Sequence, residues 1–463
     1  MKLKKINVGK LFGMFNHEIA INSISGITII IGENGLGKTV LLEMIEAFFK
    51  GKYYYFKHVV FDEIIFEFDD GISWNVKKEE KKDSPTKLLL TQLNKKKKQY
   101  KPLNLFDFES KSWQFHGSKR RFIEHRIPSK FPFLTRVGNN IWEDNRTGRI
   151  IHIDELALRS SQPNLFDFQD NEELPKWFID RHKKINVSLI ETQRLISIEG
   201  KEEKSLKKAV EKYSAELTNH IKSLLTESTE LSSKLDRTYP NRLVERLENS
   251  TNVSDTELNK ELLKLEKKRK LLDTVGLIEI EKDSNILEID NPQNVVKDVL
   301  MLYVEDSFEK IKIFDQIAEK INILLNIINK RFKHKKLFID KEEGFLFRSK
   351  ILLDKNGKVI LDDDGEALID EDGQGKVIDL KNLSSGEQNE LVLFYLLLFK
   401  TESNSLILID EPEVSLHISW QNSFIEDLKE ITKLNGLDVV IATHSPDIIG
   451  NNWDLKVELT GLE

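Results

Sequence analysis

The residues best suited to chemistry near the start of the chain lie in the stretch ITIIIGENGLGKTVLLEMIEAFF, residues 27–49. Its glycines and the Lys-Thr pair that follows match the P-loop spacing, in which backbone N–H groups surround the phosphates of a nucleoside triphosphate. The lysine would reach the β- and γ-phosphates, and the threonine would bind magnesium. A chance glycine-rich turn is the alternative. The predicted nucleotide-binding residues here are Asn34, Gly35, Gly37, Lys38, Thr39 and Val40.

The loop has no group able to activate a water molecule, and the missing group appears far along the chain in SLILIDEPEVSLH. An apolar run typical of a buried strand ends there in Asp410, which would hold magnesium. Glu411 beside it could polarise the attacking water as a general base. Acids after an apolar run also mark ordinary strand ends, but their combination with a P-loop favours the catalytic interpretation.

Two further stretches extend this pattern. NLSSGEQNELVLFYLLLF, which starts at Asn382, has a Leu-Ser-x-Gly-(Glu/Gln) core before an apolar helix, and LDVVIATHSP carries His444 after its last predicted strand. These stretches resemble the signature motif and the switch histidine of ABC-type ATPases. The motifs also follow that family's order along the chain, with a Q-loop candidate at Gln193, Walker B at 406–411 and a D-loop at 413–417.

The resemblance implies ATP as substrate, Mg²⁺ as cofactor, and composite sites in which the signature residues of one subunit bind the nucleotide of another. A homodimer, and higher oligomers, would follow. Ser385 replaces the usual first glycine of the signature, and Glu387 stands where transporters often have Gln, which is like the SMC and Rad50 branch. The implied catalytic residues are Glu411 and His444, the implied metal ligands Thr39, Gln193 and Asp410, and the further nucleotide contacts Gln193, Ser384, Gly386 and Glu387.

Within the family, the large insertions between the motifs make a transporter a poor match. The chain is more similar to the OLD-like and SMC-like ATPases of bacterial anti-phage defence. Because 19 residues follow His444, we expect no nuclease on this chain, and the resemblance is to nuclease-partnered ATPases: first the AriA family of PARIS systems, then the PtuA family of Septu systems. It implies a separately encoded nuclease effector and a phage-encoded trigger protein, with a DNA mimic as one kind of trigger.

Two other functions stay open at the sequence level. One is an SMC- or RecF-like repair or recombination ATPase that binds DNA. The other is a structural module that binds ATP but scarcely turns it over. Steady phosphate release that is lost in a Glu411 variant would exclude the structural module.

Composition limits the class of protein. The chain has 463 residues, 39% of them hydrophobic, and a net charge of −7, which argues against a globally basic nucleic-acid binder. No apolar run approaches the roughly 18 residues of a membrane span, and the first residues are not of the signal-peptide type. Cysteine is absent, which fits a reducing cytoplasm. We therefore expect a cytoplasmic protein without a membrane partner.

The elements that would position these residues predict an α/β fold: an ABC-type P-loop ATPase head with an insertion at a sheet edge and a short antiparallel, coiled-coil-like helical hairpin. Pro240 should end the first arm of the hairpin at roughly 45 Å, and Ser254 to Glu257 has capping-box spacing before the second helix. In the N-terminal lobe a hairpin should turn at Asp70-Gly71, and a further hairpin is expected around 137–153. The expected ranges are an N-terminal lobe at 1–76, a basic and aromatic-rich insertion at 77–184, a Q-loop strand at 185–200, the hairpin at 201–290, long helices at 291–335, a β-meander at 336–380 and a C-terminal lobe at 381–463.

Two segments have open interpretations. Residues 77–101 carry ten Lys against three acids, and a second basic cluster spans 119–126. A solvated loop is the simpler interpretation, and a patch for DNA, RNA or an acidic protein is the alternative. Asp-x-(Asn/Asp)-Gly units recur every eight residues at Asp354, Asp362 and Asp370. They predict Asp/Gly turns of a β-meander, with calcium binding as the weaker alternative.

Overall fold

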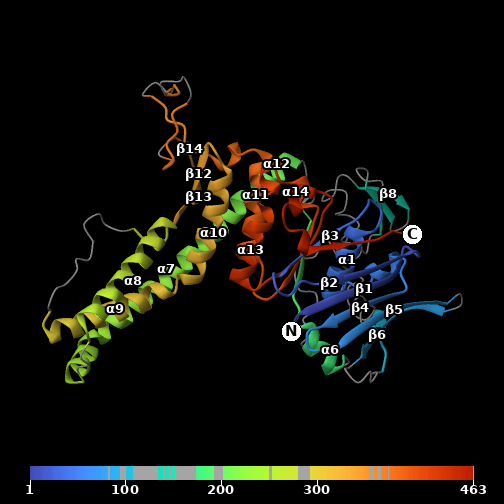
Figure 1. Ribbon diagram of the computed structural model, residues 1–463, viewed down its shortest axis with the longest axis horizontal. Helices are drawn as coiled ribbons and strands as arrows, with labels where there is room; N and C mark the ends of the chain where they lie inside the picture. Colours follow the sequence, from blue (N-terminus) through green and yellow to red (C-terminus); the bar gives the residue numbers. More distant parts are fainter. Residues whose placement is uncertain are drawn as a thin grey trace. The chain divides into compact units, whose positions relative to one another are not determined.

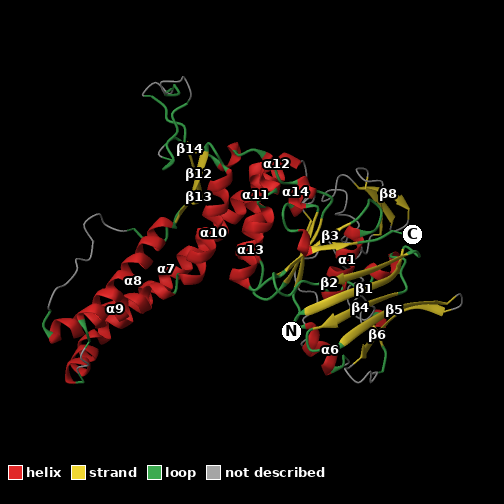
Figure 2. Cartoon of the chain, viewed as in Figure 1, coloured by secondary structure: helices red, strands yellow, loops and turns green. Residues whose placement is uncertain are grey.

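The computed structural model has two compact units (Figures 1 and 2). The first unit comprises Met1–Leu206 and Lys400–Glu463, and the second comprises Lys207–Phe399. Gln193, Asp362, Lys95 to Lys98 and the cluster at 119–126 lie outside the described residues. The described residues are 1–81, 84–93, 101–107, 134–138, 141–144, 149–152, 174–191, 202–249, 253–279, 292–354, 358–361, 367–373 and 375–461.

A parallel sheet forms the centre of the first unit. Its strands are apolar almost without interruption, as expected for strands covered on both faces. Helix α1 (Lys38–Phe49) packs on this sheet. Because all neighbours run parallel, their carboxyl ends meet at one edge, where ligands of open α/β sheets bind. The order is β11 (Val187–Glu191), β15 (Leu406–Asp410), β16 (Asp438–Ala442), β3 (Ile27–Ile31) and β17 (Lys456–Glu458).

An antiparallel sheet completes the core of this unit. Phe48 of α1 stacks on Phe66 and meets the edge of Trp74, so the helix joins the two sheets. The predicted hairpin at Asp70-Gly71 is present, with Gly71 in the left-handed region at φ 78°. The order is β2 (Phe15–Ala20), β1 (Leu3–Leu11), β4 (Glu63–Phe68), β5 (Ser73–Lys81), β6 (Ser84–Leu93) and β7 (Leu103–Asn104).

Smaller elements surround these sheets in the first unit. Where a hairpin was expected around 137–153, an antiparallel sheet has the order β10 (Arg149–His152), β9 (Ile141–Asp144) and β8 (Leu134–Gly138). The helical segments are α2 (Tyr55–His58), α6 (Lys176–His182), η5 (Pro412–Val414), α12 (Ile418–Gln421), α13 (Phe424–Asn435), α14 (Pro446–Ile449) and η6 (Trp453–Leu455).

Long helices dominate the second unit: α7 (Glu202–Glu248), α8 (Asp255–Thr274), α9 (Asn294–Lys312) and α10 (Asp315–Arg331). The predicted break at Pro240 is wrong, because α7 continues through the proline. The whole helix has 47 residues and is about 70 Å long at 1.5 Å per residue. Proline removes one backbone donor. Pro240 has no N–H to donate to the Asp236 carbonyl four residues before it. The Arg242 guanidinium donates to the neighbouring Leu235 carbonyl at 2.9 Å.

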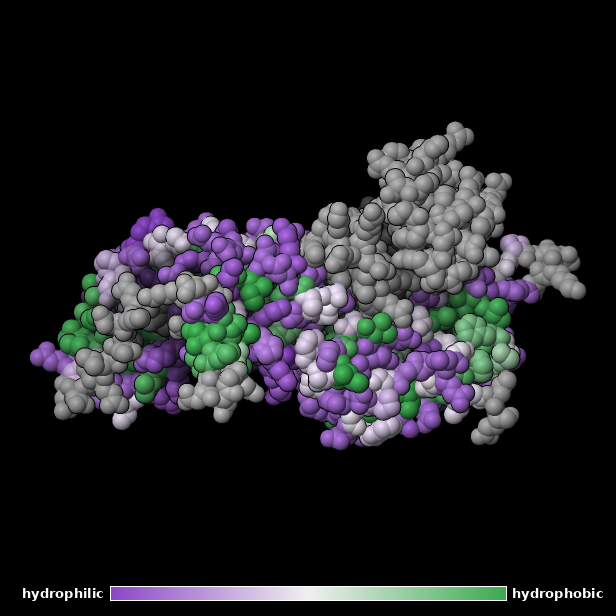
Figure 3. Space-filling model, turned by 90° about the horizontal axis from the view of Figure 1, so that it is seen from above, coloured by the Kyte–Doolittle hydropathy of each residue, from purple (hydrophilic) through white to green (hydrophobic). Residues whose placement is uncertain are grey.

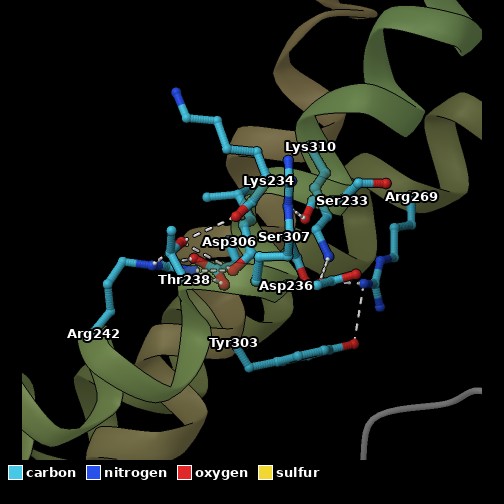
Figure 4. Close-up of polar contacts among 12 residues, drawn as sticks. Ser233, Lys234, Asp236, Thr238, Arg242, Arg269, Tyr303, Asp306, Ser307 and Lys310 are labelled. Atoms are coloured by element: carbon cyan, nitrogen blue, oxygen red, sulfur yellow. Dashed lines mark hydrogen bonds and ion pairs between the residues drawn. The ribbon is translucent and has the colours of Figure 1, made fainter.

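Polar contacts hold these helices together (Figure 4). Arg242 of α7 pairs through both terminal nitrogens with Asp306 of α9. From α8, Arg269 donates to the Tyr303 hydroxyl of α9 at 3.1 Å. The predicted capping residue Ser254 accepts from the Glu257 N–H at the start of α8. Helix α9, expected outside the hairpin, therefore contacts both α7 and α8.

The rest of the second unit carries the signature segment. A small antiparallel sheet has the order β12 (Lys335–Asp340), β13 (Gly344–Ser349) and β14 (Val377–Ile378). It leads through η3 (Leu380–Asn382) to α11 (Ser385–Tyr395), which ends in one π-type turn (Leu396–Lys400). The buried pair of Arg331 and Glu390 ties α11 to the end of α10. No helix in the described ranges has the length and apolar character needed to cross a bilayer.

Candidate nucleotide-binding site

The loop between β3 and α1 has the backbone shape that a phosphate cradle needs. Gly35 and Gly37 both lie in the left-handed region, at φ 89° and 84°. A Cβ on Gly37 would come within 2.7 Å of Leu11 Cδ2, so the loop can take only glycine there without a shift. Helix α1 has no side-chain cap and no acid in its first turn. Its first N–H groups are therefore suited to an anion.

Lys38 is buried and folds back onto its own loop. Its Nζ donates to the carbonyls of Gly32 at 2.8 Å and Glu33 at 3.0 Å, and lies 3.4 Å from His444 Nδ1. Burial lowers the pKa of Lys38, because it disfavours the charged form, while the carboxylates of Glu411, Asp410 and Glu413 act in the opposite direction. The ammonium group is thus held where phosphate oxygens would take over from the two carbonyls.

The predicted magnesium ligands also lie together. Thr39, at the start of α1, donates its hydroxyl to Asp410 Oδ1 at 3.2 Å. Asp410 is the last residue of β15, two strands away from β3 in the sheet. A hydroxyl and a carboxylate side by side are the oxygen donors that Mg²⁺ takes in phosphoryl-transfer sites. The residues present therefore fit the ion.

Glu411 has a strained backbone directly after β15. Its φ and ψ of 45° and 58° place a non-glycine residue in the left-handed region, which costs about 1–3 kcal/mol and is common at active sites. Its N–H donates to the Ala442 carbonyl at 2.8 Å, so the neighbouring strand holds the turn in place. The turn takes the carboxylate out of the strand direction and into the field of Lys38.

Glu413 is a site residue that sequence reasoning placed in the D-loop but gave no role. Its carboxylate accepts from the Thr443 hydroxyl and from the His444 N–H, both at 2.8 Å. It therefore ties the turn after β15 to the turn after β16 and fixes the backbone that carries His444. The sequence signal that could have pointed to it was a second acid close behind the Asp-Glu pair.

Phe12 is the second residue that the sequence did not single out. It lies in the turn between β1 and β2, with φ 54°. Its ring Cε2 would be 2.9 Å from a Cβ on Gly37, and the side chain is 39% exposed. An accessible aromatic ring beside the loop is suited to stacking on a nucleotide base. The only sequence signal was one aromatic residue between Gly9 and Gly13, and that pattern is too weak to predict a nucleotide contact.

The signature residues belong to the second unit. Ser384 caps α11, accepting from the Glu387 N–H at 3.3 Å, while the Glu387 carboxylate accepts from the Ser384 N–H at 2.8 Å. Lys335 donates to both oxygens of that carboxylate, at 2.9 and 2.7 Å. A Cβ on Gly386 would meet nothing within 4 Å, so the start of α11 is open. Nucleotide binding by these residues stays a prediction.

The structure brings together Lys38, Thr39, Asp410, Glu411 and His444 at the carboxyl edge of the parallel sheet. Asn34 is exposed in the loop and Val40 is half-buried in α1. Gln193 follows β11, the outer neighbour of β15, and lies outside the described residues. The arrangement can hold the phosphates of a nucleotide with one divalent ion and present a carboxylate to a water molecule.

The AAA ATPase domain family model matches residues 1–449. The chain belongs to this family. The protein is therefore a P-loop ATPase. Its α/β fold is consistent with an ABC-type head. No curated relative matches its sequence.

Solved structures similar to this ATPase include SMC heads and RecF. An Smc head domain with an extended coiled coil, from Pyrococcus furiosus, has 12% identity and a TM-score of 0.31. The match covers 96% of this chain and 90% of the Smc chain. The SMC head domain from Thermotoga maritima has 10% identity and a TM-score of 0.31, and the match covers 99% of this chain and 95% of the SMC chain. The recombination mediator protein RecF has 12% identity and a TM-score of 0.28, and the match covers 100% of this chain and 98% of the RecF chain.

Proposed function

We propose that the chain binds ATP with Mg²⁺ and hydrolyses it to ADP and phosphate, at sites shared between two copies. The observation that carries this proposal is the meeting of Lys38, Thr39 and Asp410 beside the turn that holds Glu411. In each site, one copy supplies these residues and the other supplies Ser384 and the start of its α11. The sharing itself rests on the sequence resemblance to ABC-type ATPases.

Each residue has one task in this reaction. Lys38 leaves the two loop carbonyls and neutralises the β- and γ-phosphates, and Thr39 and Asp410 hold the metal. Bound Mg²⁺ would neutralise charge that develops on the phosphate oxygens. Glu411 accepts a proton as the water oxygen bonds to the γ-phosphorus, and the bond from that phosphorus to the bridging oxygen of ADP breaks. His444 lies beside Lys38, where it can hydrogen-bond to the γ-phosphate.

Replacing Glu411 by Gln tests the catalytic assignment. The amide keeps the shape of the side chain but cannot accept the proton, so we expect nucleotide binding to persist and phosphate release to fall about 100-fold or more. Phosphate release is measured at saturating ATP, and a fluorescent nucleotide reports binding. Lys38→Ala is the matched control, because it should lose binding as well. Turnover within a few fold of the wild-type rate would place the base elsewhere.

In the cell, we assign this ATPase cycle to a sensor and scaffold of an anti-phage defence complex. The chain assembles into a homodimer and higher oligomers, holds a separately encoded nuclease effector, and releases or activates it on meeting a phage-encoded trigger protein, with a DNA mimic as one kind. The support is the sequence resemblance to nuclease-partnered ATPases. The test is phage challenge of cells that carry the chain with its neighbouring gene, wild type against Lys38→Ala. Equal survival would refute the role.

A repair or recombination ATPase that binds DNA is the second candidate. It is favoured by the ten lysines between residues 77 and 101. Contacts from lysine to phosphate release counterions, so affinity for DNA should fall steeply between 50 and 200 mM salt. Tight and salt-dependent binding to duplex DNA, without protection against phage, would favour this function over the defence role.

A further inference from the structure

His17 is a polar side chain in the interior of the first unit. Seen from above, the described surface of the protein is largely hydrophilic, with hydrophobic side chains gathered in patches (Figure 3). His17, by contrast, is 3% exposed. Burial alternates along β2, and His17 shares its buried face with Ile19, while its ring stacks on Phe15 with the centroids 5.9 Å apart. A polar ring in such a place is unfavourable unless it is hydrogen-bonded.

The hydrogen-bond partner of His17 is the backbone of the phosphate loop, residues 32–37. The ring Nε2 lies 2.8 Å from the Leu36 carbonyl oxygen. Because a carbonyl only accepts, the neutral ring carries its proton on Nε2 and donates it. The other ring nitrogen, Nδ1, is buried and has no hydrogen-bond partner in the described part of the chain. Burial lowers the pKa of His17, while the bond to Leu36 acts in the opposite direction. The ring is therefore neutral, and its one N–H is used on the loop.

The Leu36 carbonyl depends on this donor. Leu36 is 5% exposed, so water cannot readily replace a lost partner. Helix α1 begins its own bonding one residue later, where the Leu41 N–H donates to the Gly37 carbonyl at 2.8 Å. Within the described ranges, no backbone N–H donates to the Leu36 oxygen. Without the histidine, this buried carbonyl would be left unpaired, which is an unfavourable state.

The direction of the Leu36 carbonyl decides what the loop presents to a ligand. In a trans peptide the C=O and the following N–H point in opposite directions. A carbonyl that faces His17 therefore turns the Gly37 N–H away from β2 and toward the inside of the loop. If the peptide were reversed, a carbonyl oxygen would face the phosphates instead. Gly37 has no Cβ to oppose that reversal, so the bond from His17 selects one of two accessible orientations.

The remaining anchors of the loop differ from His17 in one respect. A Cβ on Gly32 would lie 3.0 Å from Leu36 Cδ1, so the leucine side chain packs on the first residue of the loop. The carbonyls of Gly32 and Glu33 accept from Lys38. Those two bonds must break when phosphates arrive. The bond from His17 comes from outside the loop and can persist in the nucleotide complex.

We propose that His17 is a positioning residue for nucleotide binding, which holds the peptide between Leu36 and Gly37 with its N–H directed at the phosphates. The inference rests on the proposed ATPase function and adds a residue that lies outside every motif of the sequence. His17 acts through the backbone and touches none of the groups assigned to the metal or the attacking water. Loss of its N–H therefore weakens nucleotide binding more than turnover.

His17→Phe tests this role, because the phenyl ring can keep the stacking on Phe15 but has no donor. We expect the Kd and the KM for MgATP to rise about tenfold, while kcat stays within about threefold of the wild type. His17→Gln places an amide N–H at about the reach of Nε2 and should recover most of the affinity. His17→Asn has a shorter side chain and should not. Titration with a fluorescent nucleotide and steady-state phosphate release measure these constants.

Gln92→Met is the matched control. Gln92 is a buried residue of β6 in the same sheet, and it accepts from the Trp74 indole N–H at 2.9 Å. Its loss also removes a buried hydrogen bond, but the phosphate loop is untouched, so affinity for MgATP should match the wild type. Melting temperatures show how much stability each variant loses.

Four results would overturn the role of His17: wild-type affinity in His17→Phe, an equal loss of affinity in Gln92→Met, equal affinities in the Gln and Asn variants, or a fall in kcat at unchanged KM. A wild-type protein that binds no MgATP in the same titration would refute the proposed function itself. A wild-type protein that binds MgATP, with unchanged binding in His17→Phe, would refute the positioning role alone.

Discussion

At the scale of single residues, the state of Lys38 limits how the site begins its work. The ammonium group is bonded to two carbonyls of its own loop, so arriving phosphates must replace those acceptors. The replacement is favourable because a hydrogen bond between two charged groups is roughly twice as strong as one between neutral groups. Burial has also already removed most of the water from the lysine, so little further desolvation is needed when the nucleotide binds.

Glu413 should act as a positioning residue for His444. Glu413→Ala removes the acceptor for the Thr443 hydroxyl and the His444 N–H, and we expect kcat to fall about 10–100-fold. Nucleotide affinity should change little, because Lys38 and Thr39 are untouched. Glu413→Gln keeps one acceptor oxygen and should recover part of the loss. Steady-state kinetics and nucleotide titration separate the two effects.

Glu430→Gln is the control for this experiment, because it removes an exposed carboxylate of α13 in the same unit. It should leave both kcat and KM unchanged. A Glu413→Ala enzyme that loses affinity in proportion to kcat would indicate a role in nucleotide binding instead.

The sequence predicted the site to the extent that chemistry is encoded in local spacing. The loop from Gly32 to Thr39 and the strand before Asp410 were recognisable, because glycines, a lysine and paired acids must stand at fixed distances along the chain. Glu413 and Phe12 were not recognised. Their roles depend on which turns become neighbours in three dimensions, and no local pattern contains that information.

At the scale of elements, we expect Arg242 to stabilise α7 where the helix continues through Pro240. Arg242→Met retains helix propensity but removes the donor to the Leu235 carbonyl and both bonds to Asp306. We expect local destabilisation of about 1–3 kcal/mol. Amide hydrogen exchange over residues 230–248 should then be faster in the variant.

Arg237→Met is the matched control, because the exposed Arg237 guanidinium donates to the Ser233 carbonyl of its own helix. Exchange in this control should match the wild type. Unchanged exchange in Arg242→Met would show that α7 tolerates the proline without help.

The same helix shows why element boundaries were harder to predict than the elements themselves. A proline inside a helical pattern ordinarily ends the helix, and that rule placed the end of the first hairpin arm near Pro240. The helix nevertheless continues, and Arg242, two residues after the proline, is bonded to Asp306 of α9. The turn at Asp70-Gly71 was predicted correctly, because glycine in a left-handed turn is a requirement of the backbone alone.

The packing of α6 predicts a dependence of stability on pH. Burial lowers the pKa of His182 to about 4, below its ordinary 6.5, and its ring packs against Phe49 and Phe178. The folded state therefore favours the neutral ring. The resulting stability is complete above pH 6.5 and is lost as the pH falls toward 4, by roughly 3 kcal/mol.

His182→Leu should remove this contribution. The difference in unfolding free energy between wild type and variant should change across pH 6.5 to 4 and stay constant above pH 7. Urea unfolding followed by tryptophan fluorescence is suitable, because Trp74 stacks on Phe178 in the same core. Parallel stability curves over the whole pH range would show that the ring does not titrate in this window.

At the scale of the whole molecule, the two units divide the predicted site residues. The phosphate loop, Asp410, Glu411 and His444 belong to the first unit, and Ser384, Gly386 and Glu387 belong to the second. Sharing between copies can therefore be tested by separating the two sets of residues on different chains.

Mixing two inactive variants makes that separation. Lys38→Ala damages the loop that a copy uses itself, and Ser384→Arg damages what it lends to its partner. In a mixed dimer, one site collects both defects and the other collects neither. Equal mixtures should recover up to about a quarter of wild-type phosphate release, since half the dimers are mixed and each has one intact site. No recovery at any ratio would indicate that each copy hydrolyses ATP alone.

The strand order of the parallel sheet also has a consequence for biosynthesis. Strand β3 lies between β16 and β17, which leave the ribosome about 400 residues later, a delay of roughly 20–80 s at 5–20 residues per second. The second unit is continuous in sequence, so it can fold during this interval. A nascent chain that has not reached Leu406 carries the phosphate loop without Asp410 or His444. Competence to bind and hydrolyse ATP therefore arises last, and a prematurely terminated chain would be stable in its helical part while remaining catalytically silent.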